Sequence, residues 1–213
     1  MCPEKRAPGA EEFLPDRLSL ASLERAASKC KGCHLYQKGK QTVFGEGLRR
    51  SRLMLVGEMP GDQEDKQGKP FVGPAGKLLD RALDEAGIDR SEAYITNVVK
   101  HFKWEKRGKR RLHRTPNASE IKACLPWLDA EIEVIEPEVI VCLGATAARA
   151  LIGSDFRVTR QRGEFVESDW APHVTATVHP SSILRSEDDE ERRRAMEEFV
   201  EDLEKVERVL NGG

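Results

Sequence analysis

The side chains best suited to chemistry stand at or near the ends of short apolar runs in this sequence. Glu58, Asn97 and His179 occupy such positions. A carboxylate, an amide and an imidazole can bind a polar substrate and stabilise charge that develops in a reaction. Taken singly, Glu58 could be a surface carboxylate, and His179, in the sequence HPSS, could belong to an ordinary turn with a capping serine. Together the three residues form a candidate site.

The cysteines could bind a metal. Cys30 and Cys33 have the C-x-x-C spacing that lets two thiolates face one metal, whereas 17 residues separate Cys124 from Cys142. Four thiolates complete a tetrahedral zinc site or hold a [4Fe–4S] cluster. The alternative is one reactive or zinc-binding pair with two ordinary core cysteines. Spacing alone leaves these interpretations open, and it predicts no role for Cys2.

The segment at 57–76, GEMPGDQEDKQGKPFVGPAG, is rich in glycine. This composition predicts a backbone that bends sharply and lets a ligand approach. The segment lacks both the P-loop and the dinucleotide-binding pattern. Phe71 within it is either a small hydrophobic anchor or a ring on which a ligand stacks. Four carboxylates argue against a phosphate cradle, because like charges repel: Glu58, Asp62, Glu64 and Asp65.

A basic segment at 100–117 interleaves positive charge with Phe102, Trp104 and His113, and its one acidic residue is Glu105. The formal net charge of the protein is −2, so this charge is concentrated locally. Such a segment is commonly a solvated face or an unspecific phosphate binder. Its place beside Asn97 instead favours a segment that grips nucleic acid near the site. The positive residues are Lys100, Lys103, Lys106, Arg107, Lys109, Arg110, Arg111 and Arg114.

The elements that must position these residues alternate along the chain. Short apolar runs predict buried strands, and helical patterns lie between them. Such alternation indicates a parallel sheet with helices on both faces, and ligands bind such sheets beyond the carboxyl ends of the strands. We therefore predict an α/β fold, a three-layer α/β/α domain with a central four-stranded parallel sheet. Strands are predicted at 53–57, 94–99, 139–144 and 174–178, and helices at 18–29, 75–86, 118–135, 145–152 and 192–210.

The chain of 213 residues, with 38% hydrophobic and 34% charged residues, is long enough for one such domain. We predict a flexible lead-in at 1–16 and a single domain over 17–210. No apolar run has signal-peptide character or the roughly 20 residues that span a bilayer. We therefore expect a soluble, cytoplasmic monomer in which structural disulfides are disfavoured.

Several motifs follow one another in the order found in a known family. GEMPG and GKPFVGPAG, Thr96-Asn97, the four cysteines and HPSS together resemble the uracil-DNA glycosylase superfamily, in particular its iron–sulfur branch. The similarity extends roughly from Cys30 to Arg185. It implies that the partner is uracil-containing DNA, and we expect single-stranded DNA as the substrate in preference to duplex DNA. It also implies a [4Fe–4S] cluster with the ligands Cys30, Cys33, Cys124 and Cys142.

By the same resemblance, Phe71 stacks on the flipped uracil, Asn97 hydrogen-bonds its Watson–Crick edge and His179 stabilises charge on the leaving base. Stacking contributes roughly 1–3 kcal/mol, and an amide matches O4 and N3–H of uracil. Arg185 is also a candidate to fill the space that the flipped base leaves. The predicted uracil-binding residues are Gly57, Asp62, Phe71, Asn97 and His179. The predicted DNA-binding residues are Lys109, Arg110, Arg111, Arg114, Ser181, Ser182 and Arg185.

The sequence KRRLHRTP at 109–116 resembles the loop of the UdgX group, whose histidine bonds covalently to the sugar. Carried over, His113 attacks C1′ after uracil departs, and Glu58 takes or balances the proton. That group typically reads GEQPG, and Met59 lacks the hydrogen bonds of a glutamine, so capture could be slower or altered. Two other functions stay open. One is a conventional turnover glycosylase that uses water, and the other is a non-catalytic, metal-stabilised DNA-binding module.

Overall fold

Five strands form the central sheet of the computed structural model, which describes residues 9–212. Their order is β2-β1-β5-β7-β6. The first four are parallel, and β6 runs antiparallel to β7 at the edge. The predicted four parallel strands are confirmed. The sheet also has a fifth strand, β6, which was not predicted because its two residues are too few to leave a sequence pattern. The strands are β1 (Leu53–Gly57), β2 (Ala93–Asn97), β5 (Val139–Leu143), β6 (Phe165–Val166) and β7 (His173–Thr177).

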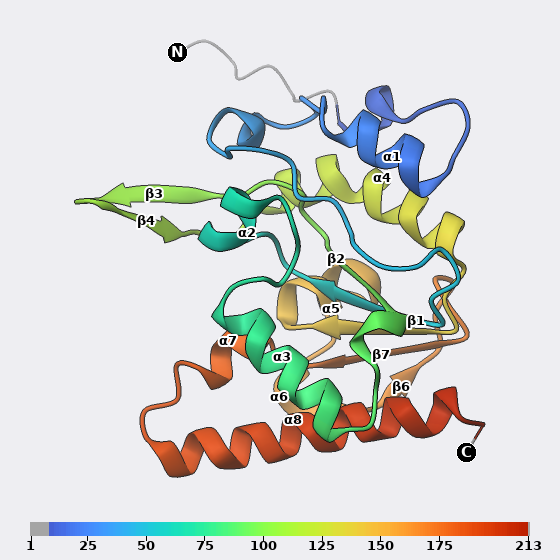
Figure 1. Cartoon of the computed structure of the whole chain (residues 1–213), viewed down its shortest axis with the longest axis vertical. Helices are drawn as coiled ribbons and strands as arrows, with labels where there is room; N and C mark the ends of the chain where they lie inside the picture. Colours follow the sequence, from blue (N-terminus) through green and yellow to red (C-terminus); the bar gives the residue numbers. More distant parts are fainter. Residues whose placement is uncertain (1–8, 213) are drawn as a thin grey trace.

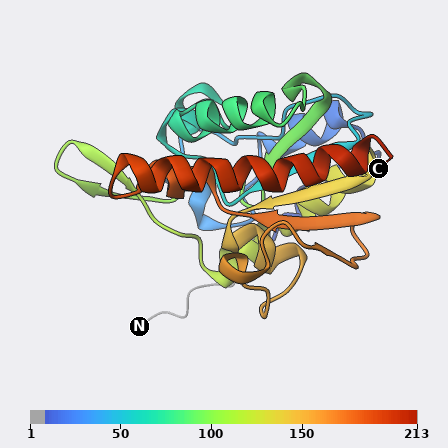
Figure 2. The same ribbon diagram turned by 90° about the horizontal axis from the view of Figure 1, so that it is seen from below.

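Helices cover both faces of the sheet, as Figure 1 and Figure 2 show. Met54 and Val56 of β1 pack toward the layer of α1, α4 and α5, whereas Leu53 and Leu55 pack toward α3 and α8. This alternation follows from the two-residue period of a strand. It confirms the three-layer architecture. The main helices are α1 (Leu20–Ala27), α3 (Pro74–Glu85), α4 (Ala118–Ile135), α5 (Ala145–Leu151) and α8 (Asp189–Leu210), and the shorter ones are α2 (Asp62–Gln67), α6 (Val158–Gln161), α7 (Pro180–Ile183), η1 (Glu11–Phe13), η2 (His34–Gln37) and η3 (Arg90–Glu92).

Local sequence explains where the helices begin. The Ser19 side chain accepts a hydrogen bond from the Ser22 backbone at the start of α1. Asn117 and Glu120 form a reciprocal capping box at the start of α4. Each cap satisfies backbone N–H groups that have no partner within the helix.

Helix α8 is amphipathic and packs against the outer side of the sheet. Met196, Phe199 and Leu203 lie on its buried face, as predicted for a helix on the outside of the domain. Among the described helices, none combines the length and apolar character needed to cross a lipid bilayer.

The chain before α1 was predicted to be a flexible lead-in over 1–16. Residues 1–8, and with them Cys2, lie outside the described residues. From residue 9 onward the segment is docked, because Ala10 is fully buried and its N–H donates to the carbonyl of Ala123 in α4 (2.7 Å).

The predicted basic loop contains a β-hairpin, β3 (Trp104–Arg107) with β4 (Arg110–His113). It projects from the body of the molecule, as Figure 1 shows. Gly108 in its two-residue turn has a φ of 60°, a conformation that suits glycine at such a turn. Trp104 pairs with His113 at the base of the hairpin. The hairpin was missed because its strands are rich in charge and show no apolar alternation.

Candidate active site

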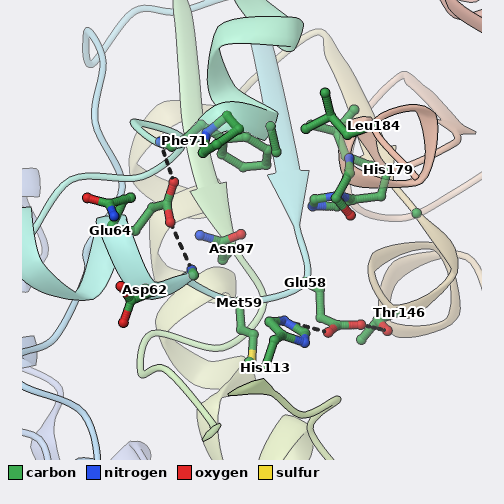
Figure 3. A pocket seen from close by; sticks show the side chains of 18 of the residues that line it. Glu58, Met59, Asp62, Glu64, Phe71, Asn97, His113, Thr146, His179 and Leu184 are labelled. Atoms are coloured by element: carbon green, nitrogen blue, oxygen red, sulfur yellow. Dashed lines mark hydrogen bonds and ion pairs between the residues drawn. The ribbon is translucent and has the colours of Figure 1, made fainter. Parts of the chain in front are cut away.

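A pocket of about 800 Å³ opens where the parallel strands end, beyond β1, β2, β5 and β7. This is the edge at which ligands bind parallel sheets. Most of the side chains predicted to act together line it: Glu58, Asp62, Phe71, Asn97, His113, His179, Ser181 and Arg185. Figure 3 shows several of them around one space. Met59 also lines the pocket, and three further lining residues, Glu64, Thr146 and Leu184, were given no role in the site from the sequence.

Phe71 forms one wall of this pocket. Its ring stacks on His179 with centroids 5.8 Å apart and planes 28° apart. Its backbone has a φ of 53°, a region that a bulky residue rarely adopts. Two glycines make room for it: a Cβ on Gly57 would approach its ring to 2.7 Å, and a Cβ on Gly76 would approach its carbonyl oxygen to 1.7 Å. The ring is thus held by local backbone geometry as well as by packing.

Asn97 lies at the end of β2, and only 2% of it is exposed. A Cβ on Gly57 would approach its Oδ1 to 2.4 Å, so the neighbouring strand also needs glycine here. The backbone carbonyl of Asn97 accepts a hydrogen bond from Nζ of Lys100 (2.7 Å). Lys100 itself forms a buried ion pair with Glu131 of α4. The backbone that carries this side chain is therefore fixed, and Asn97 lines the pocket.

The ring of His179 has a defined orientation. Its Nδ1 accepts a hydrogen bond from the backbone N–H of Ser181 (3.1 Å), so the ring proton of the neutral form lies on Nε2. Burial, together with the nearby His113 and Arg185, lowers the pKa of His179 to about 4. At neutral pH the ring is uncharged and offers one N–H donor to the pocket.

His113 reaches the same pocket from the end of β4. Its Nε2 lies 3.4 Å from Oε1 of Glu58. Burial lowers the pKa of His113, the neighbouring Glu58 opposes this effect, and Arg185 adds to it. The other carboxylate oxygen of Glu58 accepts a hydrogen bond from Thr146. Figure 3 shows His113, Glu58 and Thr146 in a row.

Glu64 holds the glycine-rich segment together. Its carboxylate accepts hydrogen bonds from the backbone of Gly73 (2.7 Å) and of Gly61 (3.1 Å). It thereby joins the two ends of the loop that carries Phe71. The sequence showed this carboxylate only as part of an acidic group, because its backbone partners lie 3 and 9 residues away.

Arg111 attaches the hairpin to the body of the protein. It forms ion pairs with Asp62 and Asp65, both at 2.5 Å, and lies over the rings of Phe102 and Trp104. Burial by itself raises the pKa of Asp62, but hydrogen bonds from Lys66 and Arg111 bring this pKa below its usual value. Only 16% of the Arg111 side chain is exposed. Arg111 and Asp62 are thus engaged with each other at the edge of the pocket.

The remaining basic residues of the segment at 100–117 differ in whether they are buried or paired with a carboxylate. Lys100 was counted in the basic segment, but it is fully buried against Glu131, so that interpretation is wrong. Lys103 pairs with Glu120, and Arg114 pairs with Glu105. Within residues 9–212, four exposed hairpin residues have no ion-pair partner: Lys106, Arg107, Lys109 and Arg110.

The short helix α7 presents the residues after His179. Ser181 accepts a hydrogen bond from Arg185 (3.1 Å) at the pocket rim. Ser182 is exposed and donates to the carbonyl of His179 (2.7 Å), so it faces away from the pocket lining. Leu184 lies at the rim and is 40% exposed, which is unusual for a large apolar side chain in this molecule.

Three of the four predicted cysteine ligands are neighbours. Burial raises the pKa of Cys33 and of Cys124, and the adjacent cysteines raise both further. The sulfurs receive N–H donors: Trp127 donates to Cys30 (3.3 Å) and the Lys100 backbone donates to Cys124 (3.3 Å).

Cys142 does not share these interactions. It is fully buried within β5, and burial alone raises its pKa. Among the described residues, no three potential ligands are close enough to hold a single metal ion. Cys30, Cys33 and Cys124 are the residues whose thiolates could contribute to an iron–sulfur cluster.

Comparison with known proteins identifies the family. Residues 44–204 match the model of the uracil DNA glycosylase superfamily. The chain belongs to the uracil-DNA glycosylase superfamily. It is 42% identical to a Type-4 uracil-DNA glycosylase of Thermotoga maritima, over 80% of this chain and 86% of the relative. It is 34% identical to a Type-4 uracil-DNA glycosylase of Archaeoglobus fulgidus, over 88% of this chain and 92% of the relative.

The region that matches the superfamily contains the whole pocket, from Glu58 to Arg185, together with the hairpin. It begins after Cys30 and Cys33. The match to the superfamily therefore bears on the residues around the pocket and does not extend to the C-x-x-C pair.

Proposed function

We propose that this member of the superfamily removes uracil from DNA and that His113 then bonds to C1′ of the remaining sugar. The observation that carries this proposal is the arrangement of His113 and Glu58. The imidazole lies at the mouth of the pocket, 3.4 Å from the carboxylate, opposite the side chains suited to a flipped base. The Type-4 names of the relatives support the excision step.

The pocket suits uracil for three reasons. Phe71 offers a fixed aromatic face for stacking. The Asn97 amide has a donor and an acceptor, which match O4 and N3–H of uracil and mismatch cytosine. His179 offers an N–H donor to the negative charge that uracil acquires as its bond to C1′ breaks.

Capture of the sugar needs a nucleophile with a free electron pair. When the C1′–N1 bond breaks, its electrons leave with uracil, and C1′ becomes electron-poor. The neutral imidazole of His113 donates a lone pair to C1′, and the carboxylate of Glu58 stabilises the resulting imidazolium. The remaining ring proton passes by way of Glu58 and solvent to the uracil anion. The lowered pKa of His113 supports this role, since it keeps the ring neutral.

The hairpin supports capture by placing His113. Arg111 fixes the hairpin to α2, and we assign it this role in place of the direct contact with DNA that the sequence predicted. Lys109 and Arg110 at the exposed tip, together with Arg114, bind phosphates of the DNA strand. Ser181, Ser182 and Arg185 bind the strand on the other side of the pocket.

Leu184 is our candidate for the side chain that fills the gap left by the flipped base. The sequence offered Arg185 as a candidate for this role, but Arg185 is hydrogen-bonded to Ser181, whereas the adjacent Leu184 is an exposed apolar group at the rim. Apolar wedges between bases are a common way to hold a distorted strand.

We propose that the cysteines hold a [4Fe–4S] cluster that stabilises the N-terminal part of the domain. The donors to Cys30 and Cys124 are suited to thiolate ligands. Iron and sulfide content will test this proposal, and the Cys124→Ala variant should lose both. The Cys142→Ala variant decides the fourth ligand: loss of iron supports Cys142 as that ligand, whereas full retention shows an ordinary core cysteine.

Incubation with uracil-containing DNA tests the function as a whole. The wild-type protein should give a protein–DNA band that survives denaturing electrophoresis, and one molecule of free uracil should be released for each molecule of covalent adduct. The His113→Ala variant should give no such band. Free uracil and an abasic site without the band would show that water is the nucleophile, and absence of both products would show a DNA-binding module without activity.

A further inference from the structure

Thr146, which belongs to none of the sequence motifs described above, contacts the carboxylate of Glu58. It lies in the first turn of α5, directly beyond the end of β5, and lines the pocket. Its hydroxyl donates a hydrogen bond to Oε2 of Glu58, while Oε1 of the same carboxylate faces Nε2 of His113. Glu58 is therefore held between the two residues, as Figure 3 shows.

The two contacts of Glu58 differ in origin. Glu58 follows β1 and Thr146 follows β5, and these strands are adjacent and parallel, with Val56 paired to Cys142. Their contact thus belongs to the central sheet. His113 comes from the projecting hairpin. The sheet can hold the carboxylate in place independently of how the hairpin is docked.

A glutamate side chain whose carboxylate has no partner can rotate about several bonds, and fixing it in one orientation costs side-chain entropy. A hydroxyl that donates to one oxygen limits this rotation and directs the second oxygen toward the imidazole. The negative charge of the carboxylate, 3.4 Å from Nε2, favours the ring proton on that nitrogen and the lone pair on Nδ1. Orientation of this kind matters when a nucleophile must compete with water for one carbon atom.

We propose that Thr146 is a positioning residue that directs the sugar to His113 rather than to water. It acts through Glu58 and does not itself touch the reacting atoms. This inference rests on the proposed function, because it concerns how the sugar is divided between the histidine and water. The bond that forms is still the one between C1′ and the imidazole, and no further reactant is needed.

The test compares Thr146→Val, which removes the hydroxyl and keeps the shape, with Thr146→Ser, which keeps the hydroxyl. For each protein, the amounts of covalent adduct, abasic DNA and free uracil are measured in one reaction. We expect Thr146→Val to lower the ratio of adduct to abasic product about tenfold, in line with the loss of a hydrogen bond to a charged group. Thr146→Ser should restore the ratio. Thr159→Val, an exposed threonine outside the pocket, is the matched control.

The ratio of products separates positioning from a structural role. A wild-type ratio in Thr146→Val overturns the inference. An equal loss of excision and adduct, with a lower melting temperature and an unchanged ratio, also overturns it, because Thr146 would then only support the fold. If the wild-type protein releases uracil without any adduct, the proposed function fails and the role of Thr146 in capture fails with it. An adduct-forming wild type with an unaltered variant removes the role of Thr146 alone.

Discussion

His179 illustrates how one backbone contact determines the chemistry of a side chain. The N–H of Ser181 occupies Nδ1, so the neutral ring can only donate through Nε2. We predict that His179→Ala lowers the single-turnover rate of uracil release by about 100- to 1000-fold, the usual effect of removing one donor to a developing anion. Arg194→Ala, on the exposed part of α8, serves as the control. A rate within threefold of wild type would show that uracil leaves without help from this ring.

The protonation state of His113 gives a pH dependence at the same scale. Only the neutral ring has a lone pair for C1′, and burial brings its pKa below the ordinary value of about 6.5. We therefore predict that the rate of adduct formation is constant from about pH 8 to 6.5 and falls at lower pH. Uracil release by His113→Ala in the same buffers separates this effect from the titration of His179. A rate that rises as the pH falls from 8 would contradict attack by the neutral ring.

At the residue scale, the sequence could predict groups that stand at strand ends but could not predict their partners. Asn97 and His179 were identified from position and residue type, and both line the pocket. Lys100 was misjudged, since a lysine in a basic run gives no sign that Glu131 lies opposite it in space. Thr146 also follows a strand end, so the strand-end rule applied to every strand could have found it.

At the scale of elements, the buried ion pair between Lys100 and Glu131 joins the segment after β2 to α4. Tyr94 and Thr96 of β2 also donate to the Glu131 carboxylate. We predict that Glu131→Gln lowers the free energy of unfolding by about 3–5 kcal/mol, because it leaves a buried ammonium without its counter-charge. Urea unfolding measures this change.

The matched control for that variant lies two residues along the same helix. Glu133 is exposed, so Glu133→Gln should change the free energy of unfolding by no more than about 0.5 kcal/mol. Equal effects of the two variants would mean that the buried pair contributes nothing specific to α4.

The main strands and helices could be predicted because burial on both faces leaves continuous apolar runs and helical periods. The hairpin could not. Its strands are stabilised by side chains that meet across space, namely Arg111 with Asp62 and Asp65, and a charged sequence does not reveal such contacts. Gly108 in the sequence RGKR was the one local sign of a turn.

At the scale of the whole molecule, four exposed basic residues without an ion-pair partner in the described part of the chain lie together on the hairpin, namely Lys106, Arg107, Lys109 and Arg110, and we propose that they bind DNA. Each phosphate contact contributes a slope of about 0.7 to the dependence of binding on salt concentration for single strands. We predict that Lys109→Ala with Arg110→Ala lowers the slope of log K against log salt by about 1.4. Fluorescence anisotropy with single-stranded DNA measures it.

Arg49→Ala with Arg50→Ala is the matched control for charge. Both residues are exposed and precede β1, so they lie near the amino ends of the parallel strands, whereas the pocket lies at the carboxyl ends. An equal change in slope for both pairs would show that the total charge matters and its location does not.

The proposed function depends most on one bond, between His113 and C1′ of the sugar. After reaction with uracil-containing DNA and nuclease digestion, the protein is cleaved after glutamate, which yields the peptide 106–120 with His113 as its single histidine. Fragmentation by mass spectrometry should place a deoxyribose phosphate remnant on His113. An unmodified peptide, or a remnant attached to another residue, would contradict capture by this histidine.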